Sequence, residues 1–223
     1  MRESMEAKRP FRFSTRLHLS ELTGLRASNL SQLLDCIRNV PGSSIYYNTH
    51  AFLQQYQYLV PEPPHDFAYW VSEVLGEVEL GEQLAGIDPL AYSKIHELQE
   101  KIAQTIEVYL QDNVFAKLRF ARRNEEFNFI KTISFVLPTN FTAYDLREFM
   151  EALKKITIDS IYFHIFEARL RLQKPTNDFS IWIEESLGDK QLAERIARLD
   201  PYSRTLEDLR GAIIKIIEKR VSQ

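Results

Sequence analysis

The sequence predicts a mainly helical α+β fold with a minor β element, built from two copies of one unit. The motif P-x-x-D-F-x-x-W-x-x-E-x-L-G occurs at Pro63–Gly76 and again at Pro175–Gly188, and it contains both tryptophans of the 223-residue chain. Both copies open with alternating apolar and polar residues and continue with apolar residues at helical spacing. We therefore expect a pseudo-twofold tandem duplication in which each copy is one strand followed by about five helices.

The duplication extends well beyond the motif. A shift of 116 residues aligns Phe11 and Phe13 with Phe127 and Phe129. After a loop that is four residues shorter in the second copy, a shift of 112 aligns the two motifs, and a shift of 111 aligns the last helix. Such a period is too long for a solenoid repeat. We assign the first repeat unit to residues 1–112, a connector to 113–126 and the second repeat unit to 127–223.

The opening strand is predicted from a period of two. One face carries Phe11, Phe13, Thr15, Leu17 and Leu19, while the other carries Arg12, Ser14, Arg16 and His18. This alternation is typical of a half-buried strand, and the second copy keeps the same phase from Phe127 to Phe135. A lone strand cannot satisfy its backbone hydrogen bonds, so the two strands should pair with each other or with those of a partner chain.

Two helices should follow each strand. Ser28 or Asn29 can cap the first one, which ends at Pro41-Gly42, and Tyr144 or Asp145 opens its counterpart. The next helix is aromatic; its apolar face includes Ile45, Tyr46, Phe52, Leu53 and Tyr56, and the prolines between Pro61 and Pro64 end it.

The repeated motif predicts a short helix with a cap, a buried face and a stop. Asp66 and Asp178 are expected as N-caps, and each tryptophan as a core anchor. Gly76 and Gly188 suit the left-handed position that ends a helix. Two further helices complete each unit, one leading into Asp88-Pro89 or Asp200-Pro201, and a final one that Thr205-x-x-Asp208 opens as a capping box in the second copy.

Composition restricts the class of protein. The formal net charge of −3 argues against a dedicated nucleic-acid binder. A single cysteine, Cys36, excludes an intrachain disulfide and a cysteine-rich zinc site. The N-terminus lacks the apolar core of a signal peptide, and no apolar run approaches the length of a membrane span. These features predict a cytoplasmic protein that does not enter a membrane.

Several segments of the first copy resemble a prokaryotic family of unknown function. They are Pro10-Phe-Arg-Phe, Leu19-x-Glu-Leu-Thr-Gly24, Val40-Pro-Gly-Ser-Ser-Ile-Tyr-Tyr47 and Pro61-Glu-Pro-Pro-x-Asp-Phe-Ala-Tyr-Trp70. The resemblance covers nearly the whole chain and implies a prokaryotic cytoplasmic protein without an assigned activity. It also implies histidines near Tyr47, where this chain has Asn48 and Ala51, so no metal role is carried over from that segment.

The weak catalytic candidates are two histidines and two glutamates. His50 lies on the aromatic helix and could act as a base or ligand with Asp66 or Glu73, or it could be a hydrogen-bonded histidine at the edge of a core. His164 aligns with Asn48 and not with His50, so a symmetric metal site is not expected, and we predict no metal. Glu73 and Glu185 could face each other across the dyad as acid and base, or could form salt bridges with neighbouring helices.

Tyr46 and Tyr162 are weak candidates for ligand binding, because each follows Ser-Ile and could send its hydroxyl into a cleft. Tyrosines in such a pattern more often pack their rings in a core. Lys117, Arg119, Arg122 and Arg123 form a basic run in the connector that could contact phosphate. Glu125 and Glu126 follow at once, so a solvated connector helix explains the run better. The sequence contains no P-loop or dinucleotide-binding motif and leaves the cofactor unknown.

The hypothesis that fits these patterns is a non-catalytic interaction or regulatory module. The excess of aromatic residues favours an exposed apolar surface, and therefore a homo-oligomer, most simply a dimer, or a complex with a protein partner. The alternative is a small-molecule or metal-dependent enzyme whose site lies in the cleft between the repeats. Nucleic acid and membrane are not expected as partners.

Overall fold

The structure is a computed structural model that describes residues 6–51, 65–199 and 205–222. It is rich in helix and contains one two-stranded sheet in its described part, which confirms the mainly helical α+β prediction. The chain forms two compact units, one made of Met1–Leu17 with Phe135–Gln223 and the other of His18–Ser134. We call them the terminal unit and the central unit.

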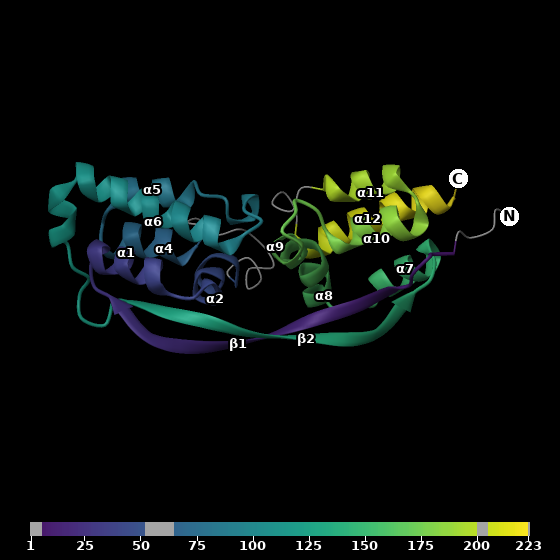
Figure 1. Cartoon of the computed structure of the whole chain (residues 1–223), viewed down its shortest axis with the longest axis horizontal. Helices are drawn as coiled ribbons and strands as arrows, with labels where there is room; N and C mark the ends of the chain where they lie inside the picture. The colour runs from purple at the N-terminus through teal and green to yellow at the C-terminus, as the bar shows by residue number, and fades with distance from the viewer. Residues whose placement is uncertain (1–5, 52–64, 200–204, 223) are drawn as a thin grey trace. The chain divides into compact units, whose positions relative to one another are not determined.

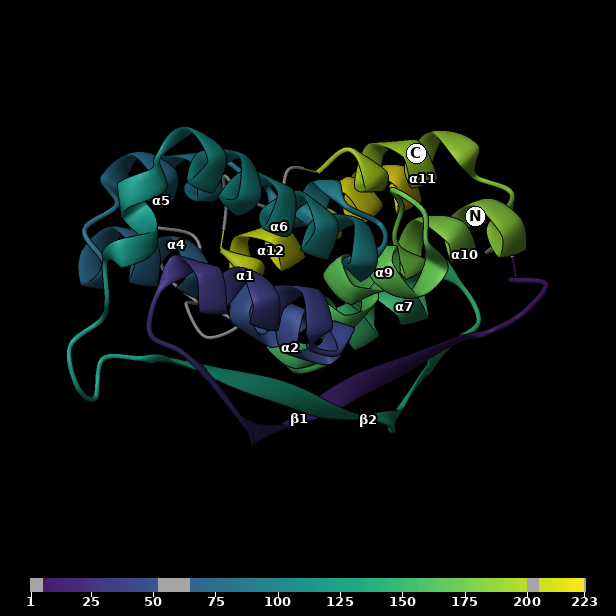
Figure 2. The ribbon, with the colours of Figure 1, turned by 60° about the vertical axis from the view of Figure 1, so that its left-hand side comes forward.

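The two strands are β1 (Phe11–Ala27) and β2 (Phe127–Ala143), and they run antiparallel in the same chain (Figures 1 and 2). Four contacts across the sheet define the register: Thr23 binds Phe129, Thr139 binds Phe13, Glu21 binds Lys131, and His18 binds Ser134. The residue numbers in each of these pairs add up to 152. Pairing between chains is therefore not needed to satisfy the strands.

The alternation of β1 predicts that one apolar face packs on the helices along the whole strand. The structure differs from this prediction. Phe11 and Phe13 are buried, but Leu17 and Leu19 are each 49 % exposed. Beyond Ser14, the inward positions belong to Arg16 and His18, which contact helix residues. The set of residues that faces the helices changes at Ser14, because the Ser14 amide and carbonyl both bond to helix side chains.

The central unit carries the helices that follow β1. They are α1 (Leu30–Asn39), α2 (Gly42–Tyr46), the π-helix η1 (Tyr47–Ala51), α4 (Asp66–Tyr69), the π-helix η2 (Trp70–Val74), α5 (Val78–Ala85), the 3₁₀ turn η3 (Pro89–Ala91), α6 (Ile95–Asp112) and the 3₁₀ turn η4 (Val114–Leu118). Asn29 caps α1 by accepting a hydrogen bond from the Gln32 amide, as predicted.

The terminal unit repeats this order after β2. Its helices are α7 (Leu146–Leu153), α8 (Ile158–Tyr162), the π-helix η5 (Phe163–Glu167), α9 (Ala168–Leu172), α10 (Asp178–Leu187), α11 (Lys190–Ala197) and α12 (Leu206–Val221). Asp145 caps α7, and Thr205 with Asp208 forms the predicted capping box of α12. The predicted positions of Phe52, Leu53, Tyr56, the prolines from Pro61 to Pro64, and Asp200-Pro201 lie outside the described residues.

The repeated motif begins its helix one residue earlier than predicted. The N-caps are His65, which accepts from the Ala68 amide, and Asn177, which accepts from the Ser180 amide. Asp66 and Asp178 are the first helical residues, so the prediction that they are the caps was wrong. The aspartates are thereby released for other contacts. The stop was predicted correctly, because Gly76 and Gly188 have φ of +70° and +72°.

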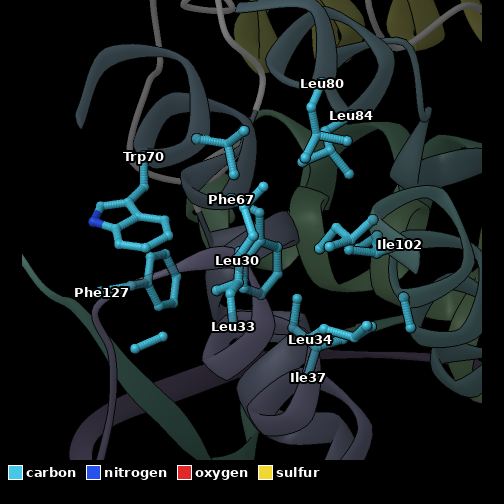
Figure 3. Packing of buried hydrophobic residues seen from close by; sticks show 14 of the residues in the cluster. Leu30, Leu33, Leu34, Ile37, Phe67, Trp70, Leu80, Leu84, Ile102 and Phe127 are labelled. Carbon is cyan, nitrogen blue, oxygen red and sulfur yellow. The ribbon is translucent and has the colours of Figure 1, made fainter. Parts of the chain in front are cut away.

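The core of the central unit is completed by the start of β2 (Figure 3). Phe127 stacks on Phe67, with ring centroids 5.1 Å apart, and meets the edge of Trp70 at 5.8 Å. The terminal unit uses the start of β1 in the same way, since Phe11 lies 5.4 Å from Phe179 and 5.6 Å from Trp182. Each set of helices thus packs on the phenylalanines that open the other repeat.

Hydrogen bonds repeat this exchange at equivalent positions. The Trp70 indole donates to the Glu125 carbonyl and the Trp182 indole to the Arg9 carbonyl, both at 2.7 Å. The Ser44 hydroxyl donates to the Ile130 carbonyl at 2.8 Å, and the Ser160 hydroxyl donates to the Ser14 carbonyl at 2.7 Å. The two acceptors of the indoles are 116 residues apart in the sequence, and so are the two acceptors of the serines and the two serines themselves.

The exchange predicts which unit a strand mutation weakens. Phe13 and Phe129 are both 0 % exposed, so truncating either to alanine should cost about 3–5 kcal/mol. Phe13→Ala should perturb the indole N–H resonance of Trp182, while Phe129→Ala should perturb that of Trp70. Nitrogen-15 NMR of the two indoles measures this, and each variant serves as the control of the other. A Phe13→Ala effect confined to Trp70 would contradict the exchange.

Candidate functional site

The strongest concentrations of buried polar side chains lie at π-helical segments. The η1 and η5 segments occupy equivalent places in the two repeats, each directly after the short helix that contains Ser-Ile-Tyr. π-Helical turns often mark functional positions, because the extra residue shifts side chains relative to a regular helix.

In the terminal unit, His164 is 4 % exposed and uses both ring nitrogens. Its Nε2 accepts the Ser14 amide at 2.9 Å, so the proton must reside on Nδ1, which donates to Asp178 Oδ2 at 2.7 Å. Burial lowers the pKa of His164, more than offsetting the opposing effect of the Asp178 carboxylate. The ring is thus a neutral imidazole that ties the strand to the helices and has no lone pair available for a substrate.

Two arginines complete this cluster. Arg171 donates to Asp178 at 2.6 Å, and Arg16 donates to the buried carboxylate of Glu167 at 2.6 Å. Both guanidinium groups lie over the ring of Phe163, at 4.5 Å for Arg171 and 5.9 Å for Arg16. The Arg16 contact again joins β1 to a helix of the second repeat.

The central unit has different side chains at the equivalent places. Asn48 stands where the second repeat has His164, and its amide donates to the Ser44 carbonyl at 2.7 Å and to the Ile130 carbonyl at 3.3 Å. Asp66 stands where the second repeat has Asp178. Burial raises the pKa of Asp66 to about 6. Among the described residues of the central unit, the contact between strand and helices is therefore kept, while the charged cluster is not.

His50 is 2 % exposed and lies one residue from the η1 end. The Thr49 hydroxyl donates to the Ile45 carbonyl at 2.7 Å, so the Thr49 oxygen accepts from His50 Nδ1 at 2.8 Å. The imidazole stacks on Tyr46 with ring centroids 5.1 Å apart, and His18 stacks on Tyr46 at 5.7 Å. The structure therefore brings together His50 and Tyr46, and it adds His18, which the sequence did not single out.

The remaining candidates fall in separate surroundings. Tyr162 is 2 % exposed and stacks on Phe166 at 5.2 Å, in line with the ring-packing role common for buried tyrosines. Glu73 and Glu185 are both exposed, and Glu73 accepts a hydrogen bond from the Ser72 hydroxyl at 3.2 Å. The two glutamates belong to different compact units.

A second pair of carboxylates was missed from the sequence. Glu77 and Asp189 are each 7 % exposed and directly follow the glycines that end the motif. Glu77 accepts from the Tyr109 hydroxyl at 2.7 Å, and burial raises the pKa of that tyrosine to about 12. Asp189 caps α11 and binds Arg220 at 2.6 Å. The sequence could have revealed this pair, because Glu77 and Asp189 align at the same shift of 112 as the two motifs. Their contacts with neighbouring helices indicate a structural role.

The contacts that the structure gives these clusters hold elements together. Among residues 6–51, 65–199 and 205–222, no group of three or more His, Cys, Asp or Glu side chains could hold a metal ion. In the same part of the chain, no helix is both long and apolar enough to cross a membrane. What the geometry supplies is a set of buried polar anchors for the exchanged strands.

The N-cap residue His65 should make folding sensitive to acid. Its Nδ1 accepts from Ala68 and its Nε2 donates to the Leu84 carbonyl, and burial lowers its pKa from 6.5 to about 4. A lowered pKa means that stability is lost as pH falls from 6.5 to about 4. Asp66 acts in the opposite sense, because its raised pKa adds stability as pH falls from about 6 to 3.8.

Replacing His65 with the residue found at Asn177 should separate these effects. In His65→Asn, an amide oxygen can still cap the helix, but the proton-linked loss disappears, so acid should destabilise the variant less than the wild type, by about 3 kcal/mol at most. Urea unfolding at a series of pH values measures this, with Asp66→Asn as the matched control of opposite sign. An unchanged pH dependence in His65→Asn would contradict the assignment.

The comparisons with known proteins agree with this fold and name no activity. No curated protein matches the chain. A solved structure titled "The structure of OrfY from Thermoproteus tenax" is similar, with a TM-score of 0.81 and 28 % sequence identity over 98 % of each chain. The family described as a family of unknown function (DUF5752) matches residues 8–218. The chain therefore belongs to this family of unknown function.

Proposed function

We propose that the protein is a non-catalytic interaction or regulatory module made of two homologous repeats, 1–112 and 127–223, joined by a connector at 113–126. The contacts of Trp70 and Trp182 and those of Ser44 and Ser160 recur at positions 112 or 116 residues apart and support this duplication. In this proposal the two repeats have exchanged their opening strands, and the polar clusters exist to hold that exchange. The single cysteine supports a cytoplasmic location, and the similarity to a protein of Thermoproteus tenax supports a prokaryotic source.

The observation that carries the proposal is an apolar strand face turned to solvent. By the register of the sheet, Leu17 faces Phe135 in the terminal unit, and these side chains are 49 % and 48 % exposed. In the central unit, Leu19 faces Ile133, and they are 49 % and 39 % exposed. Facing apolar pairs stabilise a sheet, but in water they leave a surface that favours association.

A second copy of the chain is the partner that this face fits best. Each unit carries an exposed apolar pair on its strands, and a twofold dimer would bury the same patch of both chains against itself. Each strand has one hydrogen-bonded neighbour in the sheet, so its other edge faces no further strand among the described residues. Homodimers typically bury surfaces more apolar than the rest of the protein.

The candidate catalytic residues support a binding role over chemistry. Both nitrogens of His164 are occupied by Ser14 and Asp178. Glu73 and Glu185 are exposed, whereas catalytic acids and bases are usually tuned by burial and close charged neighbours. We therefore favour interaction as the function and place the dimer at the strands.

The dimer can be tested by adding charge to the strand face. We expect the wild type to be dimeric in light scattering after size-exclusion chromatography, and Leu19→Lys with Ile133→Lys to shift it to monomer, because four buried charges would be introduced per interface.

Val108→Lys is the matched control, since Val108 is 49 % exposed on α6 and lies outside the strands. Circular dichroism should show that all variants remain folded. A wild type that stays monomeric throughout the accessible concentration range would overturn the proposal, as would an equal effect of the control.

A further inference from the structure

The end of the central unit carries a second exposed apolar surface, independent of the strands. We call residues 114–123, which contain η4, the apolar–basic segment. Four of its side chains lie largely in water: Val114 is 62 % exposed, Phe115 84 %, Leu118 70 % and Phe120 61 %. Isolated exposed apolar residues are ordinary in proteins, but four within seven positions are a candidate interaction surface.

The exposure does not come from a loose backbone. Ala116 is 5 % exposed and belongs to the core of the central unit. Arg119 donates to the Gly76 carbonyl at 3.2 Å and pairs with Glu77 at 3.0 Å. The Ala121 amide donates to the Ser28 carbonyl at 2.7 Å. The segment is fixed at its middle and at both sides of Phe120, so the fold holds these apolar side chains outward.

Three cations accompany the apolar side chains. Lys117, Arg122 and Arg123 are exposed, and within the described part of the chain none of them forms a salt bridge. Arg119 differs, because Glu77 and two backbone carbonyls already occupy its guanidinium. A rigid surface that combines phenylalanine and arginine has the composition of a protein-interface core, and its charge calls for carboxylates.

Other anionic partners fit this surface less well. A single-stranded nucleic acid would stack on Phe115 and Phe120, but Val114 and Leu118 offer no ring for stacking. An anionic membrane would be attracted by only three free cations, and Glu125 and Glu126 follow them directly. A protein segment can match both the aliphatic side chains and a small number of positive charges.

We propose that the apolar–basic segment binds an acidic, amphipathic segment of a partner protein. Apolar side chains of the partner would cover Phe115, Leu118 and Phe120, while its carboxylates would pair with Lys117, Arg122 and Arg123. This inference rests on the proposed interaction function and names the chemistry of a partner distinct from the second copy at the strands. An experiment can therefore disprove one of these two interactions without disproving the other.

The test uses the full chain and a fluorescein-labelled helical peptide with leucine along one face and glutamate on the others. Fluorescence anisotropy should show binding of this peptide and no binding of the matched peptide in which lysine replaces glutamate. Phe115→Ser with Leu118→Ser should weaken binding at least about tenfold, as expected for the loss of interface anchors. Arg122→Glu with Arg123→Glu should exchange the preference, so that the lysine peptide binds.

Val108→Lys is the control that should leave peptide binding unchanged. Failure of the glutamate peptide to bind, or equal binding by the Phe115→Ser/Leu118→Ser variant, would overturn the inference. So would tighter binding of oligo(U) or of phosphatidylglycerol vesicles through the same arginines. Light scattering on the same variants keeps the two proposals apart, because none of these substitutions should change the dimer at the strands.

Discussion

The hydrogen bond from each tryptophan indole to the backbone just before the opposite opening strand is the constraint on which the rest depends. A single strand cannot satisfy its own backbone groups, and a repeat with one strand has no partner within itself. Here β1 and β2 solve this by pairing together, and each then lays its first residues on the helices of the other repeat. Phenylalanine rings pack beside each indole, and the hydroxyls of Ser44 and Ser160 bond to the next part of each strand. Neither set of helices would have a complete core without the strand it receives.

Much of this architecture could be predicted because it repeats a local signal. The period of two at Phe11 and Phe13, the glycine stops at Gly76 and Gly188, and the capping box at Thr205 all depend on neighbours in sequence. The exchange could not be predicted, because Phe11 fits the helices of either repeat equally well on composition alone. The inward turn of Arg16 was missed for a related reason: its partner, Glu167, is 151 residues away. The cap at His65 was missed because aspartate is the stronger capping residue, and tertiary contact with the Leu84 carbonyl outweighed that preference.

The candidate site was predicted in part. His50 and Tyr46 do lie together, since a helix places residues four apart on one face. His164 finds Asp178, which the motif contained but which the capping prediction had assigned elsewhere. The exposed apolar surfaces needed the structure, since a sequence pattern gives the spacing of leucine and phenylalanine but not which face meets water. Asn48 and His164 occupy equivalent positions, and each bonds to the backbone of the opposite strand, so the contact is common to both units although the side chain differs.

Cross-linking measures the strand exchange directly. With Cys36→Ser as background, paired cysteines at Ser14 and Ser160 should be joined within one chain by a short bifunctional thiol reagent, because the Ser160 hydroxyl lies 2.7 Å from the Ser14 carbonyl. Cysteines at Ser14 and Ser44, which belong to the same repeat, should remain unlinked. Efficient linkage of Ser14 to Ser44 and none to Ser160 would show that each strand packs on its own repeat, and would contradict the account.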